Sequence, residues 1–184
     1  TILQPLTVPE MLDVTKIYSV TGYLANNSSL ILQRPFRSPH HTASAVAITG
    51  GGNWPKPGEI SLAHKGVLFL DELPEFTRQV LDVLRQPMED KIVHISRANQ
   101  STTFPANFML VAAQNPCPCG YYGDPQKSCT CSAGQIHNYQ KKISGPMLDR
   151  IDLHIQVPRL SYDKLTTNPN AESSFNIRKR IILA

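Results

Sequence analysis

The stretch that decides the fold is Gly66-Val67-Leu68-Phe69-Leu70-Asp71-Glu72, in which four apolar residues run from a glycine into two carboxylates. An unbroken apolar run this short predicts a fully buried strand of a parallel sheet. Residues 108–113 repeat the pattern and lead to Asn115. Ligands of open α/β sheets bind at the carboxyl ends of the strands, so both strands predict polar site residues at one edge of a sheet.

Helices are predicted around these two strands. Thr7 and Glu10 form a capping box that begins a helix over about residues 8–23. A second helix is predicted over residues 74–87, because a proline stands at each end of an apolar pattern with helical spacing. Another capping box begins a third helix over residues 132–145, which a Gly-Pro pair is expected to end.

Further β-rich segments complete the pattern. Residues 92–96 and 102–104 flank a polar turn and predict a hairpin. Residues 151–157 alternate apolar and polar side chains, which predicts a half-buried strand. Strands that alternate with helices indicate an α/β layer fold with parallel strands. A polar linker is expected over residues 159–170, with a new helix beginning near Ala171.

The composition sets broad limits. The chain has 184 residues, of which 41% are hydrophobic and 17% charged, which is typical of a globular protein with an apolar core. A net charge of +4 allows a nucleic-acid partner without demanding one. Neither a membrane-spanning apolar run nor a signal peptide is found, so we expect a cytoplasmic protein. The chain begins at Thr1 without a methionine and ends in an apolar, helix-like run, so we expect truncation at both ends.

The predicted edge of the sheet carries residues suited to phosphate chemistry. A carboxylate at a strand end, Asp71, can hold Mg²⁺ through water, and a second, Glu72, can act as general base. The Asn115 amide can bind a γ-phosphate, and Arg150 can stabilise transition-state charge from a neighbouring subunit. Each residue also has a purely structural interpretation. The two acids can be solvated residues of a turn, and Asn115 before a proline can start a turn. Arg150 can form a surface ion pair with a nearby aspartate.

The order of these motifs resembles that of the magnesium-chelatase-related AAA+ ATPases, within them the ComM/YifB type. The match runs from Thr1 to about Pro158. The residues that carry it are Arg34-Pro35-Phe36-Arg37-Ser38-Pro39-His40-His41, Gly58-Glu59-Ile60-Ser61-Leu62-Ala63-His64, Gly66-Val67-Leu68-Phe69-Leu70-Asp71-Glu72-Leu73-Pro74-Glu75-Phe76 and Ser144-Gly145-Pro146-Met147-Leu148-Asp149-Arg150-Ile151-Asp152-Leu153.

The resemblance implies an α/β P-loop NTPase (AAA+) core of three layers over residues 1–158. This core would contain an insert in the second helix over residues 34–63, a pre-sensor β-hairpin over residues 91–104 and a cysteine loop over residues 116–131. Residues 159–184 would be a linker and the start of the helical lid. Both the insert and the hairpin would point towards the pore of a ring.

The resemblance also implies roles and cofactors. Asp71 and Glu72 would be the Walker B pair that binds Mg²⁺ and ATP, Asn115 the sensor and Arg150 the arginine finger, in a ring that would be hexameric. The family's glycine-rich phosphate loop is expected just before Thr1. The fragment alone is therefore expected to bind ATP poorly and not to hydrolyse it.

Four cysteines form a separate C-x-C-x9-C-x-C pattern. Paired cysteines in a cytosolic protein indicate zinc rather than disulfides, and four thiolates suit tetrahedral Zn²⁺. The role would be structural, clamping the loop after Asn115. The alternative is a set of reduced surface cysteines in a turn-rich loop. The residues concerned are Cys117, Cys119, Cys129 and Cys131.

Three functions stay open at this point. The first is an ATP-driven motor that remodels DNA, of the branch-migration or helicase type in recombination or transformation. The second is a chelatase-like ATPase that remodels a protein partner for metal insertion, and the third is a non-catalytic interaction module. Candidate contacts to single- or double-stranded DNA, which would touch phosphates without reading sequence, are Arg34, Arg37, His40, His41, Lys91 and Arg97.

Overall fold

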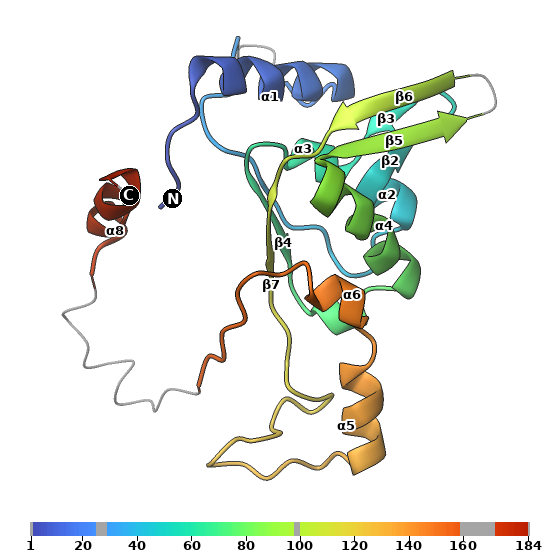
Figure 1. Cartoon of the computed structure of the whole chain (residues 1–184), viewed down its shortest axis with the longest axis vertical. Helices are drawn as coiled ribbons and strands as arrows, with labels where there is room; N and C mark the ends of the chain where they lie inside the picture. The colour runs from blue at the N-terminus through green and yellow to red at the C-terminus, as the bar shows by residue number, and fades with distance from the viewer. Residues whose placement is uncertain (1, 25–28, 98–99, 159–171, 184) are drawn as a thin grey trace.

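The computed structural model describes residues 2–24, 29–97, 100–158 and 172–183 and contains a three-stranded parallel sheet (Figure 1). Its strands, in spatial order, are β1 (Phe36–Arg37), β4 (Val67–Leu70) and β7 (Met109–Ala112). The parallel pairing of the two predicted strands is confirmed. The sequence did not predict β1, because two residues are too few to show a period.

The register of β4 and β7 aligns their carboxyl ends. Val67 pairs with Met109 and Leu70 with Ala112. The chain stays paired beyond the strands, where the Leu73 N–H donates to the Ala113 carbonyl at 2.9 Å. The residues that follow each strand therefore leave the sheet at the same edge.

The hydrophobic core lies on one side of the sheet. Leu68 and Leu70 of β4 are fully buried and pack with Val80 and Leu84 of α4, and with α2 and the hairpin of β5 and β6. The bounds of the helical elements are α1 (Val8–Thr21), α2 (Ala45–Thr49), α3 (Glu59–Leu62), the 3-10 turn η1 (Leu73–Glu75), α4 (Arg78–Asp90), α5 (Ala133–Gln140), α6 (Gly145–Leu148) and α8 (Ser174–Leu183).

The second predicted strand is less buried than expected. Met109 and Val111 of β7 are 55% and 40% exposed, whereas β4 is buried along most of its length. The reason is position, since within the described residues β7 has a hydrogen-bonded neighbour, β4, on one side only. The full three-layer arrangement stays a prediction.

Two of the helices begin where their capping boxes predict. The side chains of Thr7 and Glu10 cap α1, which ends at Gly22 in the left-handed conformation with φ 77°. Ser132 caps α5 in the same way. The Gly145-Pro146 pair, however, does not end α5. It begins α6, because a proline fits the first turn of a helix, where its missing N–H has no partner to lose.

The prediction of a helix from Pro74 to Pro87 is wrong at both ends. Pro74 lies in η1, and α4 begins only after Thr77, whose hydroxyl accepts the Val80 N–H. The helix runs through Pro87 to Asp90. Burial of the Pro87 ring in the core offsets the lost hydrogen bond, and its carbonyl still accepts the Lys91 N–H at 3.1 Å.

Two antiparallel hairpins extend the fold. β5 (Ile92–Arg97) pairs with β6 (Gln100–Pro105), which confirms the predicted hairpin, with residues 98–99 outside the described chain. The glycine-rich segment after α2 contains a second, shorter hairpin, in which β2 (Gly50–Gly51) pairs with β3 (Lys56–Pro57). Gly50 has φ 101°, and a Cβ there would lie 2.2 Å from the Lys56 carbonyl oxygen, so only glycine fits.

The strand predicted over residues 151–157 does not form. Leu153, Ile155 and Val157 are each about four-fifths exposed, at 79%, 81% and 84%. An alternating pattern needs a neighbouring strand to become a β-strand, and within the described residues this segment has none. The expected linker lies in residues outside the described chain, and the helix expected near Ala171 is α8. No described helix has both the length and the apolar character to cross a membrane.

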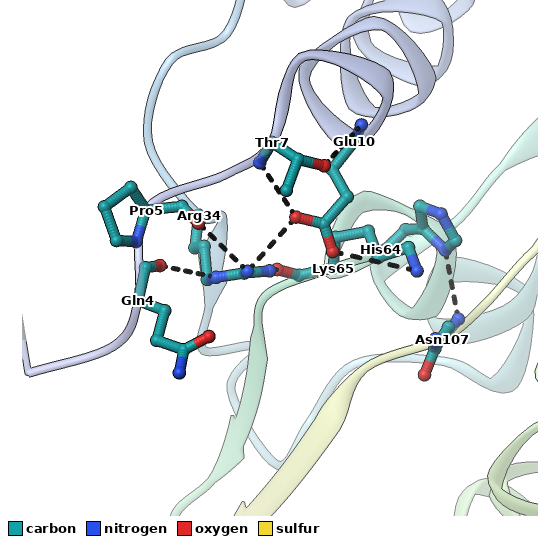
Figure 2. Close-up of polar contacts among 8 residues, drawn as sticks. All are labelled: Gln4, Pro5, Thr7, Glu10, Arg34, His64, Lys65 and Asn107. Carbon is teal, nitrogen blue, oxygen red and sulfur yellow. Dashed lines mark hydrogen bonds and ion pairs between the residues drawn. The ribbon is translucent and has the colours of Figure 1, made fainter. Parts of the chain in front are cut away.

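Arg34 ties the N-terminal segment to the turn before β4 (Figure 2). Its guanidinium donates to the carbonyls of Gln4 at 2.7 Å, Lys65 at 2.7 Å and Pro5 at 3.2 Å, and to the Glu10 carboxylate at 3.2 Å. The side chain is only 18% exposed. The structure therefore gives this predicted DNA-contact residue a full set of internal partners.

We expect Arg34→Ala to lower the free energy of unfolding by about 2–4 kcal/mol, because three carbonyls and a carboxylate lose their donor. Arg34→Lys should recover only part of this loss, since one ammonium group cannot reach all four acceptors. Urea denaturation measures both. The control is Arg85→Ala, which removes a surface ion pair with Asp82 and should cost less than about 1 kcal/mol. If Arg34→Ala costs no more than the control, this structural role is wrong.

His64 makes stability depend on pH. The ring is 6% exposed, and its Nδ1 accepts the Asn107 N–H at 3.0 Å, which requires a neutral ring. Burial, followed by the charge of Lys65, lowers the pKa of His64. Because the pKa is lower in the folded chain, the unfolded chain binds the proton at a higher pH than the folded chain does. The stabilisation is therefore present at pH values above the ordinary pKa of histidine and is lost as the pH falls below that pKa.

We therefore expect the free energy of unfolding to fall as the pH drops below about 6.5. His64→Asn keeps an acceptor for Asn107 near the position of Nδ1 but cannot titrate, so it should flatten the first part of this decline. The pKa of Glu10 is also lowered, chiefly by the Thr7 backbone hydrogen bond, so a further loss near the ordinary glutamate range should persist in the variant. Identical pH profiles for wild type and variant would contradict the assignment.

Candidate functional site

The candidate site begins where β4 ends. Asp71 directly follows the strand, and its carboxylate accepts the Glu72 N–H at 2.9 Å. Glu72 has φ 52° and ψ 46°, a left-handed conformation that is uncommon for a residue with a side chain. This turn leads into η1 and leaves both carboxylates exposed at the sheet edge. Exposed carboxylates at a strand end suit Mg²⁺, which keeps several of its waters.

The Glu72 carboxylate meets a histidine from a distant segment. Its Oε2 lies 3.2 Å from Nδ1 of His41. The centroid of the His41 ring lies 4.0 Å from that of His40, with the two planes tilted by 35°, and the ring meets Phe76 edge-on at 6.4 Å. Sequence reasoning placed His41 among the DNA contacts and missed this pairing. No spacing rule could have found it, because it depends on how the segment after β1 folds back over the strand end.

Asn115 is held through its backbone. The residue is exposed, and its backbone lies close enough to Tyr139 of α5 to favour the ionised form of that hydroxyl. Burial, followed by the charges of Glu75 and Glu72, raises the pKa of Tyr139. Next to it, the Gln140 side chain donates to the Pro116 carbonyl at 3.3 Å. Helix α5 therefore fixes the chain where it leaves β7.

Arg150 faces α4 within the chain. Its guanidinium pairs with Glu89 and donates to the Pro146 carbonyl. Its Nε is buried and has no hydrogen-bond partner among the described residues. The structure thus brings Asp71, Glu72 and the end of β7 to one edge, and holds Arg150 against a different element.

The remaining DNA-contact candidates have varied surroundings. Arg37 forms two hydrogen bonds with Glu59, at 2.6 and 2.7 Å, and these raise its pKa. His40 hydrogen-bonds a neighbouring threonine at 2.9 Å. Lys91, with φ 59°, ends α4, and its ammonium group donates back to that helix. Arg97 ends β5, and its side chain lies outside the described part of the structure.

The four cysteines converge in the loop between β7 and α5. Their sulfur atoms all lie within 4.8 Å of one another, and His137 is not part of this group. The Cys117 Sγ lies 3.4 Å from Cys119 Sγ and 3.7 Å from Cys129 Sγ. Cys117 is fully buried, and the other three are partly exposed.

The thiols differ in how readily they ionise. Hydrogen bonds from the Tyr121 and Thr130 backbones lower the pKa of Cys119 to about 5. The Cys131 N–H favours the Cys129 thiolate, but burial and the neighbouring sulfurs outweigh it and raise the pKa of Cys129 to about 12. Without a cation, one thiolate in the group therefore opposes the formation of others.

The fold and the site define a class. A parallel sheet with paired carboxylates after one strand and an amide after its neighbour fits the P-loop-like AAA+ ATPases. The sequence itself contains no G-x-x-x-x-G-K-S/T phosphate-binding loop.

The family model for magnesium chelatase, subunit ChlI, matches residues 1–165, so the chain belongs to this family. It is of the ComM/YifB type. It is 51% identical to competence protein ComM of Haemophilus influenzae over 95% of the chain and 35% of that protein. It is 46% identical to protein YifB of Salmonella typhimurium over 100% of this chain and 36% of that protein. It is 51% identical to protein YifB of Escherichia coli over 83% of this chain and 30% of that protein. The chain thus spans about a third of the length of these relatives.

Proposed function

We propose that this chain carries the hydrolytic residues of a ring-forming AAA+ motor that couples ATP hydrolysis to DNA remodelling, of the branch-migration or helicase type in recombination or transformation. The observation that carries the proposal is the pair Asp71 and Glu72 at the end of β4, beside the end of β7 that leads to Asn115. The relative named as a competence protein supports a role in DNA handling.

Each residue has a defined task in this proposal. Asp71 holds Mg²⁺ through water, and Glu72 takes a proton from the attacking water. The side-chain N–H of Asn115 donates a hydrogen bond to the γ-phosphate. Bound Mg²⁺–ATP supplies the phosphoryl group that is transferred. His41 keeps the Glu72 carboxylate in place through their 3.2 Å contact.

Arg150 acts on the site of a neighbouring subunit. Its ion pair joins an arginine side chain that is 24% exposed to a Glu89 side chain that is 55% exposed, so a phosphate could take the place of this partly solvated carboxylate. The Nε is buried and unpartnered here, and it becomes a further donor only when the side chain leaves this position. A planar guanidinium that binds two oxygens at once suits the charge of a transferring phosphoryl group.

DNA contact is proposed for the hairpin of β5 and β6. This hairpin projects beyond the sheet (Figure 1). Lys91 directly precedes β5, and Arg97 is its last residue. Arg34 and Arg37 contribute less, because carbonyls and carboxylates already take their donors. Contacts of this kind neutralise phosphates and do not read sequence.

The matching family description favours a second candidate function. A protein of the magnesium chelatase type would use the same carboxylates to remodel a protein partner for metal insertion. The ATP site cannot separate the two functions, since both need Asp71, Glu72 and Asn115. The response of ATP turnover to DNA does separate them.

We expect a protein of the relatives' full length that contains this sequence to hydrolyse ATP, and branched or single-stranded DNA to raise its turnover. Glu72→Gln should lower turnover by about 10²–10⁴-fold, the usual contribution of a general base. Glu75→Gln, three residues away in η1, is the matched control and should keep most of the activity. Turnover that ignores DNA favours the chelatase-like function, and absence of turnover in the wild type favours a non-catalytic interaction module.

A mixing experiment tests the position of Arg150. Glu72→Gln and Arg150→Ala subunits should each be inactive alone. Random rings of the two should recover about a quarter of the sites, because one interface in four joins an intact Glu72 to an intact neighbouring Arg150. If mixing recovers nothing although mixed rings form, Arg150 does not act between subunits.

A further inference from the structure

We propose that Cys117, Cys119, Cys129 and Cys131 together bind one Zn²⁺ ion, which fixes the loop between β7 and α5 and thereby the position of Asn115. This site is separate from the proposed ATPase chemistry and does not depend on it. The ion is structural, because four protein sulfurs fill a tetrahedral coordination shell and leave no open position.

The sulfur positions match a single tetrahedral ion. With Zn–S bonds of about 2.3 Å, the sulfurs of a tetrahedral site lie about 3.8 Å apart. The observed distances are 3.4 Å between Cys117 and Cys119, 3.7 Å between Cys117 and Cys129, and 3.5 Å between Cys119 and Cys129. Cys131 lies within 4.8 Å of all of them. A small inward or outward shift of each side chain completes the site.

The backbone prepares both cysteine pairs. The Gly120 N–H donates to the Cys117 carbonyl at 3.0 Å, and Gly120 has φ 80°, so a tight turn brings Cys117 and Cys119 to the same side. In the second pair, the Cys131 N–H points at the Cys129 sulfur at 3.4 Å. Backbone N–H groups directed at ligand sulfurs stabilise the negative charge of metal-bound thiolates.

The loop needs a support of this kind. Within residues 116–131, only Cys117 is buried, so the loop adds almost nothing to the hydrophobic core. An ordered loop of this length without secondary structure of its own is uncommon. Metal binding supplies the missing free energy, since ligands from both ends of the loop meet at one ion.

The ion connects the end of β7 with the start of α5. Cys117 follows Asn115 by two residues, and Cys131 directly precedes Ser132, the N-cap of α5. The far end of α5 carries Gln140, whose side chain donates to the carbonyl of Pro116, the residue after Asn115, at 3.3 Å. The metal therefore closes a ring of contacts around Asn115, and its loss is expected to loosen that residue.

The first experiment is elemental analysis of the protein, purified under reducing conditions without chelator, which should contain one zinc per chain. Replacement by Co²⁺ should give the intense visible absorption of tetrahedral thiolate coordination. Iron in place of zinc would overturn the identity of the ion. Absence of any metal, with all four thiols modified at once by a thiol reagent, would overturn the site itself.

Variants assign the ligands. Cys119→Ser and Cys131→Ser should each lower zinc affinity at least about 100-fold, since each removes a direct ligand. His137 is a potential ligand outside the group, so His137→Ala should keep one zinc per chain.

Because a cysteine variant can fail to fold, chelation of zinc from the wild-type protein gives a second measurement. Removing zinc should expose residues 116–131 to protease first, whereas unchanged proteolysis or retained zinc in both serine variants contradicts the proposal.

Discussion

The parallel pairing of β4 with β7 is the constraint on which the rest of the molecule depends. Leu70 lies opposite Ala112, and the hydrogen bond from Leu73 to Ala113 carries the pairing past the strand ends. The two carboxylates and Asn115 reach the same edge only in this register. A slip by one residue would turn Leu68 and Leu70 out of the core, so burial of the apolar side chains fixes the site as well as the fold.

The site is built on this edge by segments that are far apart in the sequence. The left-handed turn at Glu72 presents the carboxylate, and His41 contacts it from the segment after β1. Gln140 of α5 hydrogen-bonds the chain just after Asn115, and the four cysteines lie in the loop between β7 and α5. Rigid elements thus surround exposed polar groups, which is the arrangement that phosphate chemistry requires because little reorganisation can then occur during the reaction.

Local signals in the sequence were enough to predict much of the fold. The apolar run of β4, the capping boxes of α1 and α5 and the hairpin of β5 and β6 each need only neighbouring residues. The features that escaped depend on tertiary contacts. Pro87 lies inside a helix because its ring is buried, residues 151–157 stay irregular because no described strand lies beside them, and the contact between His41 and Glu72 joins distant segments. Family resemblance supplied the roles that are proposed for Asn115 and Arg150, which spacing alone left open, and these roles stay predictions.

The most direct test is a structure of a full-length protein of this type with ADP, Mg²⁺ and a mimic of the γ-phosphate. In such a structure we expect Asp71 to hold the waters of the metal ion. The Glu72 carboxylate should lie within hydrogen-bond distance of the water in line with the mimic, and the Asn115 side chain should contact the mimic itself. Arg150 of the adjoining subunit should have left Glu89 for the phosphate. A nucleotide bound away from the end of β4, or Arg150 still paired with Glu89 in every occupied site, would contradict the account.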